Sequence, residues 1–219
     1  MVRVKICGIT RPEDAELAAA LGASAIGMVL WYGSPRAVSL EAAREIAACV
    51  PRDVTVVGVL VQPSPIDILE VAERVPVHAL QLYGGGDVPE RVRRAGLRTI
   101  RAVPVGDDRD TAAVQAELEG LPLEVLVLLD AHDDRRHGGT GRRIDWHVAA
   151  RLAARRPIVL AGGLDAANVA TAIDVVAPYA VDVSSGVESR PGVKDRGRLE
   201  RFFERVTAAA GPIPRGLFA

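Results

Sequence analysis

The first thirty residues, MVRVKICGITRPEDAELAAALGASAIGMVL (1–30), contain the smallest complete unit of the fold. Val2–Cys7 and Ala25–Leu30 are short runs of β-branched and apolar residues, which is typical of buried strands. Between them, Pro12–Leu21 is rich in alanine, leucine and glutamate and has helical period. A strand, a helix and a second strand in this order predict a β/α unit with parallel strands.

The helix of this unit has sequence features that define its start. Thr10 is placed to cap it, Glu13 follows three residues later as in a capping box, and Pro12 falls in the first turn. We therefore expect the Thr10 side chain to cap this helix.

The same alternation continues along the chain. Further strands are predicted at Thr55–Val61, Ala79–Leu82, Thr99–Val103, Val125–Leu129, Ile158–Ala161 and Ala180–Val183. Further helices are predicted at Leu40–Ala48, Pro65–Arg74, Val88–Ala95, Thr111–Leu118, Trp146–Arg155, Asn168–Val176 and Arg196–Ala209. Eight units are the number that closes a β/α barrel, whereas a doubly wound open sheet seldom needs eight in so short a chain.

We predict one catalytic domain, an α/β fold with a single eight-stranded parallel β/α (TIM) barrel, over residues 1–210. Residues 211–219 contain two prolines and two glycines, and we expect them to form a poorly ordered tail. Docking of Leu217 and Phe218 on the domain is the alternative.

Charge and composition restrict the classes of partner. The 219 residues include 27 basic and 28 acidic side chains, so the formal net charge of -1 gives no general attraction to nucleic acid or to an anionic membrane. An anionic ligand must then be bound by local groups. No secretory signal and no apolar run of roughly 20 residues is seen in the sequence. The two cysteines, Cys7 and Cys49, lack metal-ligand spacing and suit a reducing compartment, so we expect a cytoplasmic protein without a metal.

Loops after the last two strands have the composition of an anion site. In β/α barrels the functional groups lie at the C-terminal ends of the strands, and the loops after strands seven and eight often bind phosphate. Here those loops contain Gly162 and Gly163, then Ser184, Ser185 and Gly186. A Gly-Gly turn alone is ordinary turn chemistry, but two such loops on adjacent strands predict a phosphate site.

Other strand ends present reactive side chains whose roles stay open from position alone. Asp130 follows a fully apolar strand, where partial burial would suit a general acid, but a loop cap fits equally well. Cys7 ends the first strand, where a small core residue is the more common role. Arg36 could bind a carboxylate or be solvated. Asp182 alternates with valines and needs a partner if it points into the barrel.

These residues lie within motifs that resemble those of phosphoribosylanthranilate isomerases. The matching stretches are Lys5–Thr10, Ser34–Arg36, Val57–Val59, Gln81–Leu82, Gly138–Gly141, Asp145–Trp146, Ala161–Leu164, Asp182–Glu188, Pro191–Gly192 and Lys194–Asp195. They cover nearly the whole chain in order.

The resemblance implies an enzyme of tryptophan biosynthesis without metal or organic cofactor. It would convert N-(5-phosphoribosyl)anthranilate to 1-(2-carboxyphenylamino)-1-deoxyribulose 5-phosphate in an Amadori rearrangement, as a monomer or homodimer. It further implies that Asp130 is the general acid that opens the ring, and that Cys7 is the base, as a thiolate with a lowered pKa.

The resemblance also assigns the substrate contacts. Arg36 would bind the anthranilate carboxylate, Asp182 the sugar hydroxyls, and the loops after strands seven and eight the phosphate. Tyr83 stands where the family usually has a histidine, and it supplies a hydroxyl but no charge near neutral pH. Alternatives are a related sugar-phosphate isomerase of the histidine pathway or with two substrates, and a non-catalytic binding barrel.

Overall fold

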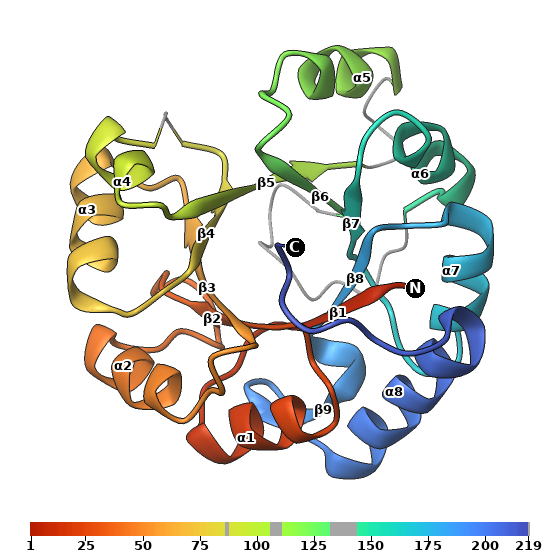
Figure 1. The fold of residues 1–219 in the computed structure, drawn as a ribbon, viewed down its shortest axis with the longest axis horizontal. Helices are drawn as coiled ribbons and strands as arrows, with labels where there is room; N and C mark the ends of the chain where they lie inside the picture. The colour runs from red at the N-terminus through yellow and green to blue at the C-terminus, as the bar shows by residue number, and fades with distance from the viewer. Residues whose placement is uncertain (86–87, 106–110, 132–143, 219) are drawn as a thin grey trace.

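The computed structural model describes residues 1–85, 88–105, 111–131 and 144–218. Eight parallel strands in sequence order form a closed barrel, with β8 paired to β1, and helices surround it (Figure 1). The predicted single TIM barrel is therefore confirmed.

The strands alternate with the helices along the chain. The strands are β1 (Arg3–Ile6), β2 (Ala25–Val29), β3 (Thr55–Val61), β4 (Ala79–Tyr83), β5 (Arg98–Pro104), β6 (Leu126–Asp130), β7 (Ile158–Leu160) and β8 (Ala180–Val183). The helices are α1 (Pro12–Ala20), α2 (Leu40–Ala48), α3 (Pro65–Arg74), α4 (Glu90–Arg94), α5 (Thr111–Glu119), α6 (Trp146–Ala153), α7 (Val169–Val176) and α8 (Arg196–Ala210). Helix α4 is shorter than predicted because Pro89 precedes it and Gly96, with a positive φ of 83°, follows its end.

One substructure was not predicted from the sequence. After β8 the chain forms a 3-10 turn, η1 (Ser185–Val187), and an antiparallel hairpin of β9 (Glu188–Arg190) and β10 (Val193–Lys194). These strands are too short to show a clear alternation of apolar and polar residues.

The start of α1 differs from the expectation. Arg11 is its N-cap and makes no side-chain capping bond, although Pro12 does lie in the first turn. The Thr10 hydroxyl instead donates to the carbonyl of Gly192, in the turn between β9 and β10. The capping prediction is wrong because a tertiary contact with the hairpin uses this hydroxyl.

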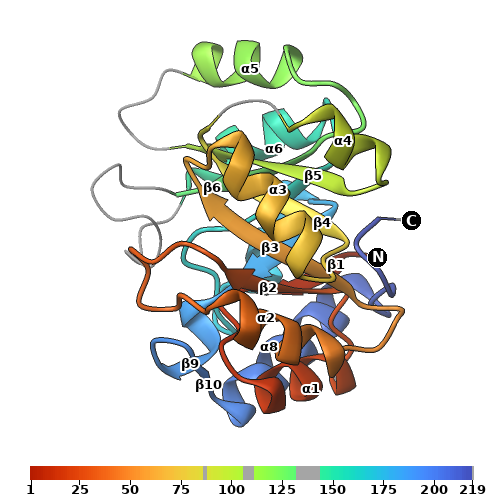
Figure 2. The ribbon, with the colours of Figure 1, turned by 90° about the vertical axis from the view of Figure 1, so that its left-hand side faces the viewer.

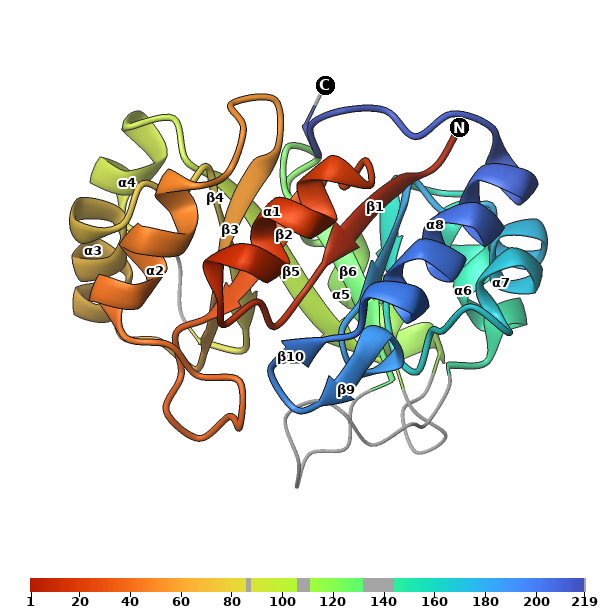
Figure 3. The same cartoon turned by 90° about the horizontal axis from the view of Figure 1, so that it is seen from below.

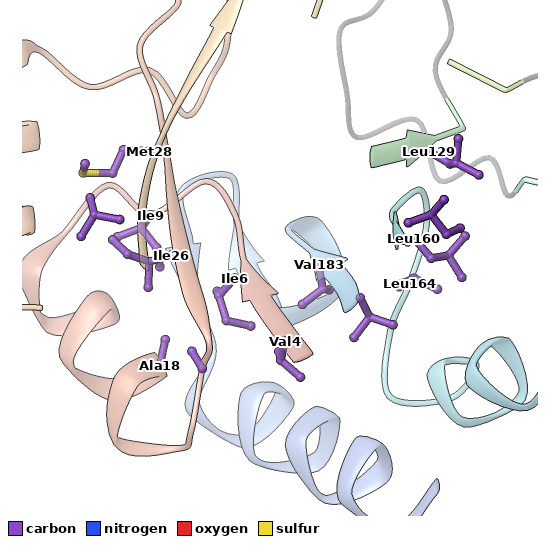
Figure 4. Packing of buried hydrophobic residues seen from close by; sticks show 14 of the residues in the cluster. Val4, Ile6, Ile9, Ala18, Ile26, Met28, Leu129, Leu160, Leu164 and Val183 are labelled. Carbon is purple, nitrogen blue, oxygen red and sulfur yellow. The ribbon is translucent and has the colours of Figure 1, made fainter. Parts of the chain in front are cut away.

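Alternate residues of each strand face two different cores. On β1, Val4 and Ile6 pack in the large cluster between barrel and helices, part of which Figure 4 shows. Cys7 belongs to a second cluster inside the barrel, and Lys5 pairs with Asp182 of β8. The side chains that point into the barrel from β1 and the residue after it, Lys5 and Cys7, are therefore polar or reactive. The outward side chains, Val4 and Ile6, are apolar and pack against the helices.

Both chain ends lie at one end of the barrel, and the β9–β10 hairpin lies at the other (Figures 2 and 3). Residues 211–218 leave α8 and cross the end at which the strands begin. The Arg3 guanidinium donates to the Gly216 carbonyl at 3.1 Å, and the Leu217 N–H donates to the Thr55 hydroxyl at 2.8 Å. The Tyr179 hydroxyl donates to the Leu217 carbonyl at 2.8 Å.

This arrangement corrects the expectation of a frayed tail for residues 211–218. Leu217 is fully buried and belongs to the cluster inside the barrel. The same cluster contains alanines near the starts of three strands, Ala25, Ala79 and Ala180. Because these side chains are small, the end of the barrel has room for a leucine from the tail, and its burial stabilises the docked form.

Candidate active site

Side chains from five segments gather at the end of the barrel where the strands finish. Cys7 follows β1, Tyr83 ends β4 and Asp130 ends β6, while Asp182 comes from β8 and Arg36 from the loop after β2. The Tyr83 hydroxyl lies 2.8 Å from an Asp130 carboxylate oxygen, and it interacts electrostatically with both Cys7 and Asp182. The structure thus brings the predicted residues into one site.

Tyr83 is a neutral hydrogen-bond donor in this site. Burial, followed by the nearby Asp130 carboxylate, raises the pKa of Tyr83 well above its ordinary value. The phenol therefore keeps its proton at neutral pH and holds one oxygen of Asp130. This contact fixes the orientation of the carboxyl group at the end of β6.

Cys7 is buried next to a charged pair. The Lys5 ammonium lies 3.0 Å from a carboxylate oxygen of Asp182, and both side chains are almost completely inaccessible to solvent. A Cβ added at Gly27 would lie 3.0 Å from the Cys7 sulfur and 3.0 Å from the Lys5 nitrogen. Gly27 therefore leaves the space that these two groups share.

The pKa of Cys7 differs from the expectation. Burial raises the pKa of this thiol, and the Lys5 ammonium opposes the rise without outweighing it. The pKa of Lys5 is itself raised, because Asp182 and Cys7 outweigh the effect of its burial. The prediction of a lowered thiol pKa is therefore wrong, because the burial of Cys7 outweighs the nearby positive charge of Lys5.

Arg36 makes its ion pair within the protein. Its Nε and Nη2 atoms bind the carboxylate of Glu188, the closest approach being 2.7 Å, and Lys194 binds the same carboxylate at 2.8 Å. Burial raises the pKa of Glu188, but the two cations outweigh it and the pKa lies below its ordinary value. The two hydrogen-bonded nitrogens orient the Arg36 guanidinium rigidly at the mouth of the barrel.

Lys194 connects the β9–β10 hairpin to the C-terminal end of β1. Besides Glu188, its ammonium binds the carbonyl of Cys7 at 2.6 Å and the carbonyl of Ser184 at 3.3 Å. Gly8, with a φ of 71°, lies beneath Arg36, and a Cβ there would be 2.5 Å from the Arg36 side chain. A glycine is needed at this position for both reasons.

The two loops predicted to bind phosphate lie in contact. A Cβ on Gly186 would be 2.0 Å from the carbonyl oxygen of Leu164, so the backbones pack directly against each other. Gly162 and Gly163 both have positive φ, 87° and 64°. Among the described residues, no protein group accepts a hydrogen bond from the N–H of Gly163, Ser185 or Gly186. Such N–H groups suit an anion.

Sequence reasoning missed several residues of the site. Lys5 could have been found, because it shares a face of β1 with Cys7, whereas Glu188 and Lys194 meet only through the unpredicted hairpin. Gln81 is fully buried on β4, and within the described part of the chain neither of its amide atoms has a partner. It lies two residues before Tyr83, on the same face of the strand.

The remaining sequence features concern one matching stretch, metal binding and membrane spans. The matching stretch Gly138–Gly141 lies outside the described residues. Across residues 1–85, 88–105, 111–131 and 144–218, no group of three or more His, Cys, Asp or Glu could hold a metal ion, and no helix is long and apolar enough to cross a membrane.

Known proteins match this chain over almost its whole length. The family model described as N-(5'-phosphoribosyl)anthranilate (PRA) isomerase matches residues 4–205. A protein of that name from Halorhodospira halophila is 44% identical over 204 residues, which are 93% of this chain and 96% of the relative.

Solved structures agree with this match. The crystal structure of phosphoribosyl anthranilate isomerase from Thermotoga maritima has a TM-score of 0.82 and 41% identity, and the match covers 95% of this chain and all of that one. A phosphoribosyl anthranilate isomerase in complex with reduced 1-(o-carboxyphenylamino)-1-deoxyribulose 5-phosphate has a TM-score of 0.78 and 40% identity, with the same coverage.

Proposed function

The chain belongs to the N-(5'-phosphoribosyl)anthranilate isomerase family, and we propose that it performs the Amadori rearrangement of tryptophan biosynthesis with Asp130 as general acid and Cys7 as general base. The substrate is N-(5-phosphoribosyl)anthranilate, and the product is 1-(2-carboxyphenylamino)-1-deoxyribulose 5-phosphate. We further propose that the protein acts in the cytoplasm, as a monomer or homodimer, without a metal or organic cofactor.

The observation that carries the proposal is the pair of proton-transfer groups around one barrel mouth. Asp130 on β6 and Cys7 after β1 are both coupled to Tyr83. Asp130 donates its proton to the ring oxygen as the C1–O bond breaks, and the nitrogen lone pair forms the Schiff base. Cys7, as thiolate, then removes the C2 proton, and the C–H electrons move to give an enolamine that relaxes to the ketone.

Three side chains would position the substrate around these groups. Arg36 uses Nε and Nη2 for Glu188, and among the described residues Nη1 has no hydrogen-bond partner, so it would bind the anthranilate carboxylate. Asp182 would accept hydrogen bonds from the sugar hydroxyls while Lys5 neutralises its charge. Tyr83 would keep the Asp130 carboxyl group turned toward the ring oxygen.

The phosphate would lie between the loops after β7 and β8. The residues are Gly162, Gly163, Ser184, Ser185 and Gly186. Within the described part of the chain, the N–H groups of Gly163, Ser185 and Gly186 donate to no protein group, so they can donate to the phosphate. Binding the phosphate there anchors one end of the substrate and fixes the position of the reacting carbons.

A turnover assay with purified protein tests the proposal. We expect conversion of phosphoribosylanthranilate that persists in the presence of a chelator and falls strongly when the substrate lacks its phosphate. Cys7→Ser should stop the reaction after ring opening, with little exchange of the C2 hydrogen into solvent, because serine is too weak an acid to form the anion. Near-normal turnover by Cys7→Ser would refute the role of Cys7 as base. Turnover only of a histidine-pathway substrate, or of none, would refute the assigned reaction.

A further inference from the structure

The lysines of this chain have an unusual distribution. Of the 27 basic residues, 25 are arginine and only Lys5 and Lys194 are lysine. Both are buried, with 0% and 5% of their surface exposed, and both contact Cys7. Lysine is therefore used only beside Cys7, in a chain that uses arginine at every other basic position.

The two lysines contact different parts of Cys7. Lys194 binds the backbone carbonyl and fixes the position of the chain. Lys5 is in hydrogen-bond contact with the Cys7 side chain, and its ammonium also lies 3.0 Å from a carboxylate oxygen of Asp182. Of the two lysines, Lys5 is therefore the one whose ammonium group contacts the sulfur itself.

We propose that Lys5 is a positioning residue of the rearrangement, whose ammonium group, anchored by Asp182, stabilises the thiolate of Cys7 that removes the substrate proton. This inference rests on the proposed role of Cys7 as base. In a buried site a thiolate without a neighbouring cation is strongly disfavoured. When the Cys7 thiol loses its proton, the positive charge of Lys5 offsets part of the free-energy cost of a buried thiolate.

The space around Lys5 explains why lysine is present here. A Cβ added at Gly27 would lie 3.0 Å from the Lys5 nitrogen and 3.1 Å from its Cε atom. A guanidinium group is planar and wider than an ammonium, so it would overfill this space. Lysine supplies a compact point charge that contacts both the sulfur and the Asp182 carboxylate.

Other charged groups also face Cys7, and the test must separate them from Lys5. Asp182 on β8 raises the thiol pKa, whereas Lys194 on β10 lowers it. Arg36 from the loop after β2 and Tyr83 on β4, which carries the hydrogen bond to Asp130, also interact with Cys7. Among the charged groups, Lys5 has the largest effect on this pKa.

The experiment measures the rate at which iodoacetamide alkylates Cys7 at fixed pH, with mass spectrometry to resolve Cys7 from Cys49. Lys5→Met should slow alkylation of Cys7 about tenfold or more, which corresponds to one unit of pKa. Asp182→Asn should accelerate it. Alkylation of Cys49, in α2's C-terminal turn, should be unchanged and provides an internal control.

Lys5→Met leaves Asp182 buried without its partner, which is strongly destabilising. The double variant Lys5→Met/Asp182→Asn removes both charges, and we expect its Cys7 to react more slowly than that of Asp182→Asn alone. Equal rates in these two folded proteins would overturn the inference. Lys194→Met should slow alkylation less than Lys5→Met, and an equal effect would also overturn it.

A kinetic measurement excludes a purely structural role. The turnover of the Lys5→Met protein should recover as the pH rises, because the thiolate then forms without help, whereas structural damage would not be relieved by pH. Alkylation requires no substrate, so it tests Lys5 even if the proposed reaction fails. Absence of turnover in the unmodified protein would refute the proposed function and leave the alkylation result intact.

Discussion

The two ends of the barrel are built on opposite principles. At the end where the strands finish, Lys5, Asp182, Arg36, Glu188 and Lys194 form ion pairs with little exposure to solvent. At the other end, the chain's own tail closes the barrel with a buried leucine above small side chains. Buried ion pairs position charge but add little net stability, whereas apolar burial stabilises the fold directly. The comparison predicts that activity and stability respond to changes at different ends.

The largest expected effect is on turnover. Asp130→Asn keeps the shape of the side chain and an oxygen that accepts from Tyr83, but it removes the acidic proton. We expect kcat to fall by roughly 10²- to 10⁴-fold, as is usual for loss of a general acid. The free energy of unfolding, measured by denaturant titration, should change little. A variant that lost stability instead of turnover would contradict the separation of the two ends.

The next largest effect is on stability, at the barrel end that the C-terminal tail closes. Leu217→Ala removes the leucine inside the barrel and should lower the free energy of unfolding by about 2–5 kcal/mol. At temperatures where the variant is folded, kcat should stay close to that of the parent protein.

Leu123→Ala is the matched control for this change, because Leu123 is 87% exposed. It should alter the free energy of unfolding by less than about 0.5 kcal/mol. Equal effects of the two variants would show that the tail does not close the barrel in solution.

The smallest expected effect is on how the free energy of unfolding depends on pH, at the barrel end where the strands finish. The pKa of Glu188 is lowered, because Arg36 and Lys194 outweigh its burial. Its carboxylate therefore stabilises the fold above its ordinary pKa, and this contribution is lost as the pH falls through the lowered value. The free-energy difference between the parent protein and Glu188→Gln should shrink on acidification below about pH 5.

The exposed Glu204 provides the control for the acid measurement. Glu204→Gln should follow the parent protein closely in denaturant titrations over the same pH range. A difference for Glu188→Gln that grows on acidification would contradict the stabilising role of the Arg36, Glu188 and Lys194 cluster.

Local sequence pattern was sufficient to predict the barrel, because its strands and helices each have a clear period. Lys5 could also have been placed in the site from the sequence, because it lies two residues before Cys7 and alternate residues of a strand face the same side. By contrast, the Thr10 contact depends on the β9–β10 hairpin, which is far from Thr10 in sequence. Glu188 meets Lys194 only because that hairpin pairs, and no local pattern reports such pairing. Leu217 lies in a segment whose composition predicts disorder, and only the alanine-lined end of the barrel explains its burial.

The burial of both lysines has a consequence for chemical labelling. Reagents that acylate primary amines normally modify many surface lysines, but in this folded chain both lysine side chains are buried. Coupling of a dye or a solid support to lysine would therefore be slow while the protein is folded. Unfolding would expose both lysines, so the extent of lysine acylation would report the fraction of unfolded molecules.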